Sequence, residues 1–152
     1  MPLYHALGTV STNLVGLQFA STLVYPSEGF DAAASLKAIT EEKCSVIYGV
    51  PTMFTANLKE LEAAPEKYDV SSLRTGLIAG SVCPPPLIKR IIEDMGMDGL
   101  TIIFGMTELS CLGTLMKPGD SLEKKMTTTG PVGPHTEIKI VDNDGRTVPQ
   151  GV

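Results

Sequence analysis

The stretch that decides the fold lies at residues 100–108, which read LTIIFGMTE. Its first five residues are apolar or β-branched, as in a buried strand, and the run stops at a glycine. Two earlier segments also carry strand-forming residues. Residues 45–48 are followed by Gly49, and residues 73–79 are followed by Gly80. The sequence therefore predicts three successive strands, each ended by glycine.

Helical patterns separate these strands. A helix is expected from Asp31, a favourable N-cap, to Glu42, with Leu36 and Ile39 among its apolar positions. Further helices are expected over 6–20, from Pro51 or Thr52 to about Ala63, and from Leu87 to Met95, with a buried strand at 21–25. Strands that alternate with helices of this length predict βαβ units, an α/β fold and a mainly parallel sheet.

The alternating pattern of strands and helices stops after residue 112. Residues 113–129 are irregular and polar, with one helical turn expected near Leu122. Residues 137–141 (EIKIV) alternate like a half-buried strand, and Asn143-Asp144-Gly145 is a hairpin-type turn. We therefore expect an α/β unit over residues 1–112, followed by a linker and the start of a β-rich unit over residues 113–152.

Composition and charge exclude several classes of protein. Hydrophobic residues make up 43% of the chain and charged residues 19%, which is typical of a globular protein. The 12 basic residues are scattered and outnumbered by 17 acidic ones, so nucleic acid is not an expected partner. Three cysteines without C-x-x-C spacing and two histidines argue against a disulfide framework, a zinc site or a multi-histidine site. We expect an intracellular, reducing compartment, with cytoplasm, mitochondrion and peroxisome not distinguished.

The first 27 residues contain no Lys, Arg, Asp or Glu. A signal peptide would need a basic start, which the first five residues do not supply. A membrane span would need about twenty predominantly apolar residues, and polar residues interrupt this run repeatedly. A buried helix followed by a buried strand is therefore expected here.

The glycine-ended strands bring candidate ligand-binding residues to one edge of the sheet. In an open parallel sheet, ligands bind outside the carboxyl ends of the strands. Phe104 could stack on a planar base, Thr107 could donate to a phosphate oxygen, and Glu108 is a carboxylate of the kind that Mg²⁺ accepts. The residues alone leave two interpretations open: a ligand-binding rim, or glycines that simply mark the ends of strands.

Residues 101–110 (TIIFGMTELS) closely resemble the Y/F-G-x-T-E motif of the adenylate-forming superfamily of acyl-CoA synthetases, luciferases and peptide-synthetase adenylation domains. Four further segments match in family order, at residues 2–8, 49–53, 79–84 and 129–141. Cys83-Pro84-Pro85 and Met95-Gly96-Met97 resemble the medium- to long-chain fatty-acyl-CoA synthetase branch. The resemblance implies an internal fragment of the N-terminal domain of such an enzyme. It would comprise the parallel-sheet βαβ subdomain and the start of a β-rich, barrel-like subdomain.

The resemblance also implies roles for individual residues. Phe104 would stack on adenine, and the remaining nucleotide contacts would come from Gly80, Ser81, Val82, Gly105 and Met106. Thr107 would bind the α-phosphate, and Glu108 would hold Mg²⁺. His5 would lie beside the carboxylate that is activated, and Tyr48, Val50 and Thr52 would border the acyl pocket with it. The candidate catalytic residues are therefore Thr107, Glu108 and His5.

Structural alternatives stay open for several positions. His5 also fits a satisfied histidine at a helix start. Cys83 fits a small buried residue better than a nucleophile, because no base accompanies it. His135 is expected at the surface, and Leu7, Leu14 and Phe19 are expected in the core rather than in an acyl pocket.

The implied reaction joins a fatty acid to coenzyme A, with ATP and Mg²⁺, through an acyl-adenylate. The family's phosphate loop, its Y-x-T-G-D segment and its C-terminal domain with the catalytic lysine are not found in these 152 residues. We therefore expect no turnover from this chain by itself. The alternative is a truncated, non-catalytic remnant that binds nucleotide or acyl ligand weakly, or serves as an interaction module. The sequence predicts neither the acyl chain length nor the oligomeric state.

Overall fold

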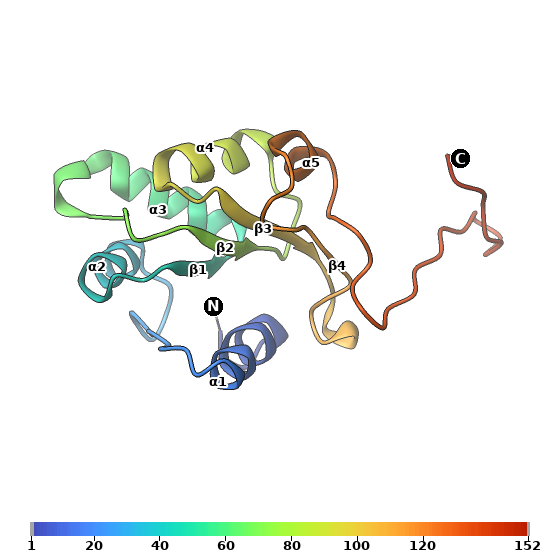
Figure 1. Cartoon of the computed structure of the whole chain (residues 1–152), viewed down its shortest axis with the longest axis horizontal. Helices are drawn as coiled ribbons and strands as arrows, with labels where there is room; N and C mark the ends of the chain where they lie inside the picture. The colour runs from blue at the N-terminus through green and yellow to red at the C-terminus, as the bar shows by residue number, and fades with distance from the viewer. Residues whose placement is uncertain (1, 152) are drawn as a thin grey trace.

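A four-stranded sheet in the order β1-β2-β3-β4 forms the centre of the protein (Figure 1). The structure is a computed structural model that describes residues 2–151. The strands are β1 (Val46–Gly49), β2 (Thr75–Ile78), β3 (Gly99–Phe104) and β4 (Thr114–Leu115). The first three are parallel, whereas β4 runs antiparallel to β3. The predicted α/β fold with a mainly parallel sheet is confirmed.

The connections between the parallel strands are helical. The α-helices are α1 (Val15–Gln18), α2 (Ala32–Glu42), α3 (Pro51–Ala63), α4 (Pro85–Met95) and α5 (Leu122–Thr127). A π-helix, η1 (Leu7–Leu14), runs directly into α1, and two 3-10 turns are η2 (Pro65–Lys67) and η3 (Thr107–Leu109). The Asp31 side chain accepts a hydrogen bond from the Ala34 amide at 2.7 Å, so it caps α2 as predicted. Gly96 ends α4 in the left-handed conformation.

The two faces of the sheet are covered unequally. On one face, Ile78 of β2 and Leu100 and Ile102 of β3 join a buried cluster with α2, α3 and α4. On the other face, a smaller cluster joins Leu7 of η1 to Ala79, Ile103 and Cys111. Figure 1 shows α3 and α4 above the sheet and η1–α1 below it. The alternation of side chains along β2 and β3 therefore produces one large core and one small one.

The N-terminal predictions are partly wrong. A helix does form within residues 6–20, and Leu7 is buried, but Leu14 and Phe19 are exposed rather than in the core. The predicted strand at 21–25 is absent: these residues pair with no strand of the described chain. A β-strand exists only where a neighbour supplies hydrogen bonds, and β-branched composition cannot supply that neighbour.

The C-terminal predictions also need correction. The turn at Asn143–Gly145 forms, with the Gly145 amide bonded to the Asp142 carbonyl at 3.0 Å. The strand predicted at 137–141 is reduced to one isolated bridge between Val141 and Thr147. A two-stranded hairpin is marginally stable alone, and this segment extends away from the body (Figure 1). Strand β4 lies in a stretch that was expected to be irregular, and the proposed division at residue 112 stays a prediction.

Candidate functional site

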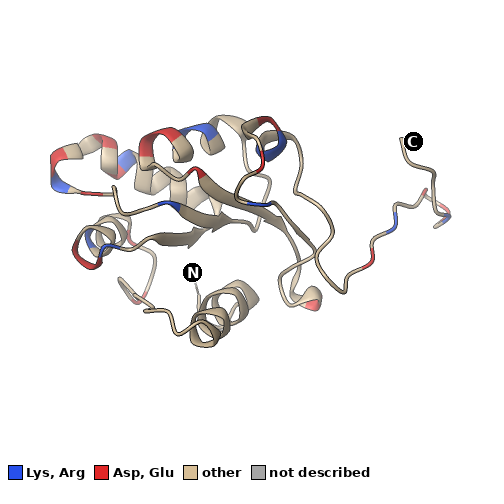
Figure 2. Ribbon diagram, in the orientation of Figure 1, with Lys and Arg blue, Asp and Glu red and all other residues tan. Residues whose placement is uncertain are grey.

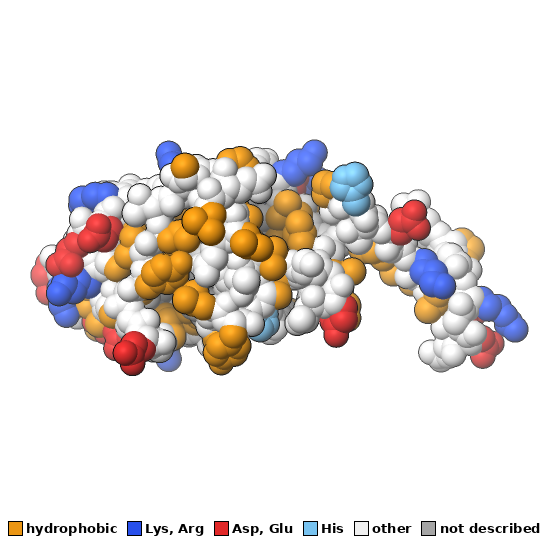
Figure 3. All heavy atoms as spheres, turned by 90° about the horizontal axis from the view of Figure 1, so that it is seen from below, with side chains coloured by type: hydrophobic (Ala, Val, Ile, Leu, Met, Phe, Trp, Pro, Cys, Tyr) orange, Lys and Arg blue, Asp and Glu red, His pale blue; other side chains and the backbone are white. Residues whose placement is uncertain are grey.

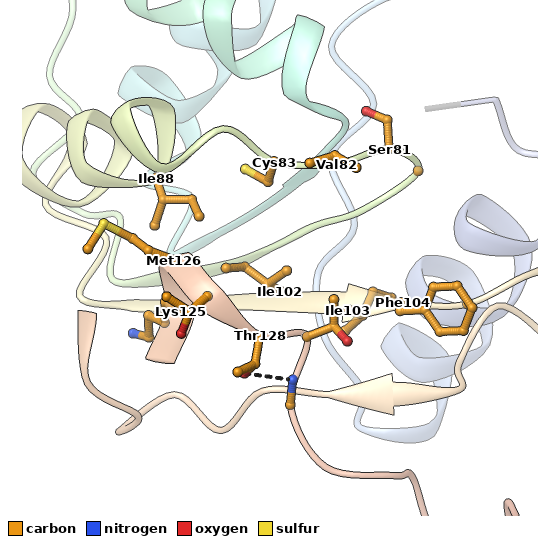
Figure 4. A pocket seen from close by; sticks show the side chains of 15 residues that line it. Ser81, Val82, Cys83, Ile88, Ile102, Ile103, Phe104, Lys125, Met126 and Thr128 are labelled. Carbon is orange, nitrogen blue, oxygen red and sulfur yellow. Dashed lines mark hydrogen bonds between the residues drawn. The ribbon is translucent and has the colours of Figure 1, made fainter. Parts of the chain in front are cut away.

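A cavity of about 670 Å³ lies at the carboxyl ends of β2 and β3 (Figure 4). Its first wall is the loop Gly80–Cys83 that follows β2. Its floor is formed by residues 102–105 at the end of β3, together with Ile88 of α4. Residues 125–130, from α5 and the segment after it, form the third wall. Three segments that are far apart in the sequence therefore enclose one space.

The loop that forms the first wall depends on glycine. Gly80 has a φ of +91°, and a β-carbon at this position would lie 3.0 Å from Cγ1 of Val50. A side chain here would be strained and crowded, so the backbone can follow this path only with glycine. The loop then leads through Pro84 into α4. Burial raises the pKa of the Cys83 thiol to about 11, so this thiol is a weak nucleophile at neutral pH.

The segment after β3 forms a closed loop. A β-carbon on Gly105 would lie 1.8 Å from the carbonyl oxygen of Cys111, so only glycine fits. The Cys111 amide donates to the Met106 carbonyl at 3.0 Å, and the Gly113 amide returns to the Phe104 carbonyl at 2.9 Å. The chain therefore leaves the sheet at 105 and rejoins it at 113. The loop between these points presents η3 to solvent.

The third wall is attached to β4. The Thr114 hydroxyl donates to the Thr129 carbonyl at 2.8 Å, and the Leu115 amide donates to the Pro131 carbonyl at 3.0 Å. Gly130 has a φ of +87°, and a β-carbon there would lie 2.5 Å from the Leu115 backbone. These contacts hold the wall beside the end of β3. Sequence reasoning missed this wall, and the glycine of the TGPVG segment was its one usable signal.

Five of the predicted nucleotide-contact residues lie together around the cavity: Gly80, Ser81, Val82, Phe104 and Gly105. Met106, Thr107 and Glu108 follow directly on the chain but do not line the cavity, and all three are exposed. His5, Tyr48, Val50 and Thr52 lie outside the lining as well. The roles of all these residues stay predictions.

Two of the predicted side chains have informative orientations. The ring nitrogen Nδ1 of His5 accepts a hydrogen bond from the Leu7 amide at 3.1 Å, so this side chain is hydrogen-bonded at the start of η1. The Phe104 ring is half exposed and points along β3, away from Ile88, Ile102 and Met126, which face one another across the cavity (Figure 4). The apolar side chains form the inner part of the cavity, and the aromatic ring stands at its rim.

No cluster of three or more His, Cys, Asp or Glu side chains suited to a metal ion occurs within residues 2–151. Within this range, Glu108 therefore belongs to no such cluster. A single carboxylate nevertheless fits Mg²⁺, which keeps several water molecules and takes most of its remaining ligands from substrate phosphates. In the same described range, no helix is both long and apolar enough to cross a lipid bilayer.

Comparisons of this chain with known proteins identify its family. Residues 1–152 match the family described as AMP-binding enzyme. The chain belongs to the AMP-binding enzyme family. The resemblance to adenylate-forming enzymes that the motif at 101–110 indicated is thereby confirmed, and it extends over the whole chain.

Curated relatives of this chain are acyl-CoA ligases. It is 41% identical to a mitochondrial medium-chain acyl-CoA ligase of Danio rerio over 152 residues, covering 99% of the chain and 25% of that protein. It is 44% identical to an acyl-CoA ligase of Aspergillus fumigatus over the same length and the same shares. The chain thus spans about a quarter of the length of the relatives it matches.

Solved structures share the fold. The crystal structure of an anthranilate CoA ligase in complex with anthranoyl-AMP matches 97% of this chain and 28% of that one, with 28% identity and a TM-score of 0.84. An O-succinylbenzoate coenzyme A synthetase from Bacillus subtilis, in complex with ATP and magnesium ion, matches 98% of this chain and 29% of its own, with 28% identity and a TM-score of 0.77. The predicted fold class is that of the N-terminal domain of these enzymes.

Proposed function

We propose that this chain forms part of the nucleotide site of an acyl-CoA synthetase, which activates a fatty acid with ATP and transfers it to coenzyme A. One observation carries the proposal: the loop after β2 and the end of β3, the two segments chosen from the sequence as nucleotide contacts, line one cavity. Its volume of about 670 Å³ lies within the ordinary range for small-molecule sites.

The cavity has the chemistry that a purine needs. Gly80 and Gly105 keep two lining segments in the paths that form the cavity, because a side chain at either position would crowd Val50 or the Cys111 carbonyl. The half-exposed Phe104 ring at the rim is available for stacking. Ile88, Ile102 and Met126 supply the apolar surface that a base would cover.

The loop after β3 is suited to phosphate. Thr107 and Glu108 are exposed, and within residues 2–151 neither side chain makes a hydrogen bond or an ion pair. The Thr107 hydroxyl is therefore free to donate to an α-phosphate oxygen. Glu108 would hold Mg²⁺, which when bound neutralises phosphate charge. The closed backbone of residues 105–113 fixes where both side chains start.

The first step of the proposed reaction needs no general base, because the substrate attacks as a carboxylate. The substrate carboxylate oxygen forms a bond to the α-phosphorus of ATP, the bond from that phosphorus to the bridging oxygen breaks, and pyrophosphate leaves. The thiol of coenzyme A then loses its proton to solvent, its sulfur bonds to the acyl carbon, the acyl–phosphate bond breaks, and AMP leaves. This chain would contribute Thr107 and Glu108, which would position the α-phosphate and stabilise the negative charge on it.

The acyl side of the site is assigned to the end of β1. Tyr48 is half-buried in β1, and burial raises its pKa, so its hydroxyl stays protonated near neutral pH. Val50 packs beside Gly80, which connects this region to the nucleotide wall. We propose that Tyr48, Val50 and Thr52 border the acyl group and that His5 lies near the activated carboxylate. The cysteines Cys44, Cys83 and Cys111 are free thiols, in keeping with a proposed reducing compartment.

The alternative function is a non-catalytic module that binds nucleotide or acyl ligand weakly, or serves as an interaction module. The chain spans about a quarter of the length of the relatives it matches. Pyrophosphate release with ATP, Mg²⁺ and fatty acids of medium to long chain separates the two. We expect no turnover from these 152 residues, and measurable turnover would contradict that expectation.

Nucleotide binding is tested through Cys83, which lines the cavity. Its rate of alkylation by iodoacetamide is followed by peptide mass spectrometry with and without millimolar AMP. We expect AMP to slow the reaction at Cys83 and to leave Cys44, which lies outside the cavity lining, unchanged. Equal rates at Cys83 with and without AMP would remove the support for a nucleotide site in this cavity.

A further inference from the structure

Lys125 is a buried cation beside the cavity. Among residues 2–151 it is the one Lys, Arg, Asp or Glu that is buried, at 4% exposure. Its ammonium Nζ donates to the carbonyl oxygen of Asp98 at 2.6 Å and to that of Pro118 at 3.0 Å. Figure 4 shows this nitrogen directed away from Ile103 and Thr128, so the ammonium itself does not face the cavity. Lys125 is nevertheless one of the residues that line the cavity.

The two carbonyl partners belong to separate segments. Asp98 immediately precedes β3, whose far end forms the cavity floor. Pro118 lies in a turn closed by a hydrogen bond from the Asp120 amide to the Lys117 carbonyl at 3.0 Å. The ammonium of Lys125 therefore connects α5, the start of β3 and the turn after β4. One side chain thus ties α5 and the turn just before it to the start of β3, which lies 27 residues away in the sequence.

The surrounding charges explain why this connection is made through carbonyls. Asp120 and Asp98 are the acidic residues near Lys125, but the Asp120 carboxylate is bonded to Lys124 at 3.0 Å. Burial lowers the pKa of Lys125, and the two aspartates oppose that effect. A buried ammonium costs free energy unless it is hydrogen-bonded, so the two carbonyl contacts are required for the side chain to remain inside.

Helix α5 needs such an anchor. It has six residues, too few for a helix to be stable by its own hydrogen bonds. Residues 126–130, which form the rest of the third wall after Lys125, begin within this helix and continue directly from its end. The apolar contact of Met126 with the core and the polar contacts of Lys125 thus hold the same short element.

We propose that Lys125 is a positioning residue for the cavity: its ammonium holds α5, and with it the 126–130 wall, against β3. Without this anchor the wall moves outward and the cavity opens toward Cys83 on the opposite wall. This geometric statement stands independently of the ligand. Its consequence, a weaker hold on the nucleotide, rests on the proposed function.

The test compares Lys125→Met with the wild-type chain in the absence of nucleotide. Alkylation of Cys83 is expected to rise by about threefold or more, because local opening of the wall exposes the thiol. Cys44, which packs at the opposite end of the core beside α2, is the internal reference. Lys124→Met is the matched control, since Lys124 is the exposed neighbour on the same helix, and it is expected to change neither rate.

The outcomes separate the possibilities. An alkylation rate that rises at Cys83 and not at Cys44 supports the proposal. Unchanged rates would overturn it, because the wall would then not depend on Lys125. Equal rises at Cys83 and Cys44 would also overturn it, because they would show a general loosening of the protein. If Lys125→Met does not fold, Lys125→Gln, which keeps an amide donor, is tested in its place. The measured quantity is again the ratio of the alkylation rate of Cys83 to that of Cys44. AMP is then added to both chains. A lack of AMP protection in the wild type counts against the nucleotide site alone, because the ratio measured without AMP still decides the role of Lys125.

Discussion

At position 105, another backbone segment lies so close that only glycine fits. The carbonyl oxygen of Cys111 lies 1.8 Å from where a β-carbon would be. Loop 105–113 can close onto β3 only with this contact in place, because the Met106 carbonyl accepts from the Cys111 amide. The glycine of the F-G-M-T-E motif therefore has a structural reason that is independent of any ligand.

We predict that Gly105→Ala destabilises the protein by about 2–4 kcal/mol, the cost of forcing a tightly packed backbone apart. Urea denaturation followed by circular dichroism measures the change. Gly119→Ala is the control, because no atom lies within 4 Å of the place that its β-carbon would take. Similar midpoints for the two variants would show that loop 105–113 is not held as described.

Asn57 is a polar residue in the middle of the main core. It lies on α3 at 1% exposure, and its Oδ1 atom has no hydrogen-bond partner within the described residues. We predict that Asn57→Leu, which keeps the branching of the side chain, raises the free energy of unfolding by about 1–2 kcal/mol. Asn57→Asp is expected to lower it. Thermal unfolding measures both, and a destabilised Leu variant would mean that the amide has a partner or that the core cannot take the larger side chain.

The raised pKa of Cys83 predicts an unusual pH dependence. With a pKa of about 11, about one thousandth of the thiol is ionised at pH 8, and the alkylation rate rises about tenfold per pH unit up to pH 10. A free thiol with a pKa near 8.5 levels off by about pH 9.5. Because the folded-state pKa lies above the unfolded one, stability from this group is complete below about pH 8.5 and is lost as the pH rises toward 11. A rate plateau at Cys83 below pH 9.5 would contradict the burial.

Secondary-structure elements form where local signals and long-range contacts agree. Helix α2 has an N-cap aspartate and buries Leu36 and Ile39 in the main core. Strand β1 pairs with β2 in parallel, with Val46 beside Thr75 and Gly49 beside Ile78. By contrast, residues 21–25 have strand-forming side chains but no partner strand in the described range. Composition therefore favours an element, and pairing decides it.

For helix α2, we predict that Asp31→Ala lowers the stability of the protein by about 1 kcal/mol, because the hydrogen bond that caps the Ala34 amide is lost. Thermal or urea unfolding measures the change. Asp144→Ala is a suitable control, because Asp144 is an exposed acidic residue in the C-terminal turn, outside any helix. Equal effects at the two positions would indicate a charge effect rather than a capping effect.

The molecule as a whole has an unequal surface. Figure 2 shows the charged residues on α2, α3, α4, α5 and the C-terminal segment, whereas η1–α1 carries none. Seen from below, hydrophobic side chains gather on this uncharged side (Figure 3). Leu17 and Phe19 are 73% and 71% exposed. Apolar surface gathered in this way promotes association in water.

We predict that the isolated chain self-associates at high concentration and that the double variant Leu17→Gln, Phe19→Gln reduces this. Light scattering after size-exclusion chromatography measures the mass across a concentration series. The double variant Lys37→Gln, Glu41→Gln, which removes an exposed ion pair on α2, is the control and should leave association unchanged. A monomer at all concentrations, or an equal effect of both variants, would contradict the prediction.

Local sequence was sufficient for three helices and three strands. The Asp31 cap, the prolines at the start of α4 and the glycines at or just after the ends of β1, β2 and β3 act within a few residues. Helices α2, α3 and α4 and the parallel sheet could therefore be predicted. The motif at 101–110 was sufficient for the family. Gly80 and Gly105 could likewise be chosen as cavity residues, because the ends of parallel strands meet at one edge of a sheet.

The third wall, the burial of Lys125 and the exposure of Phe19 were decided by tertiary structure. Lys125 reaches carbonyl groups 27 and 7 residues away, and Thr114 reaches Thr129 across 15 residues. No local pattern encodes contacts of this range, because a lysine or a threonine looks the same in a sequence whether its polar group meets water or a distant carbonyl. The sequence alone determined helices α2, α3 and α4, the three parallel strands and the family to which the chain belongs. The packing of β4 and α5 against β3 decided how the cavity is enclosed.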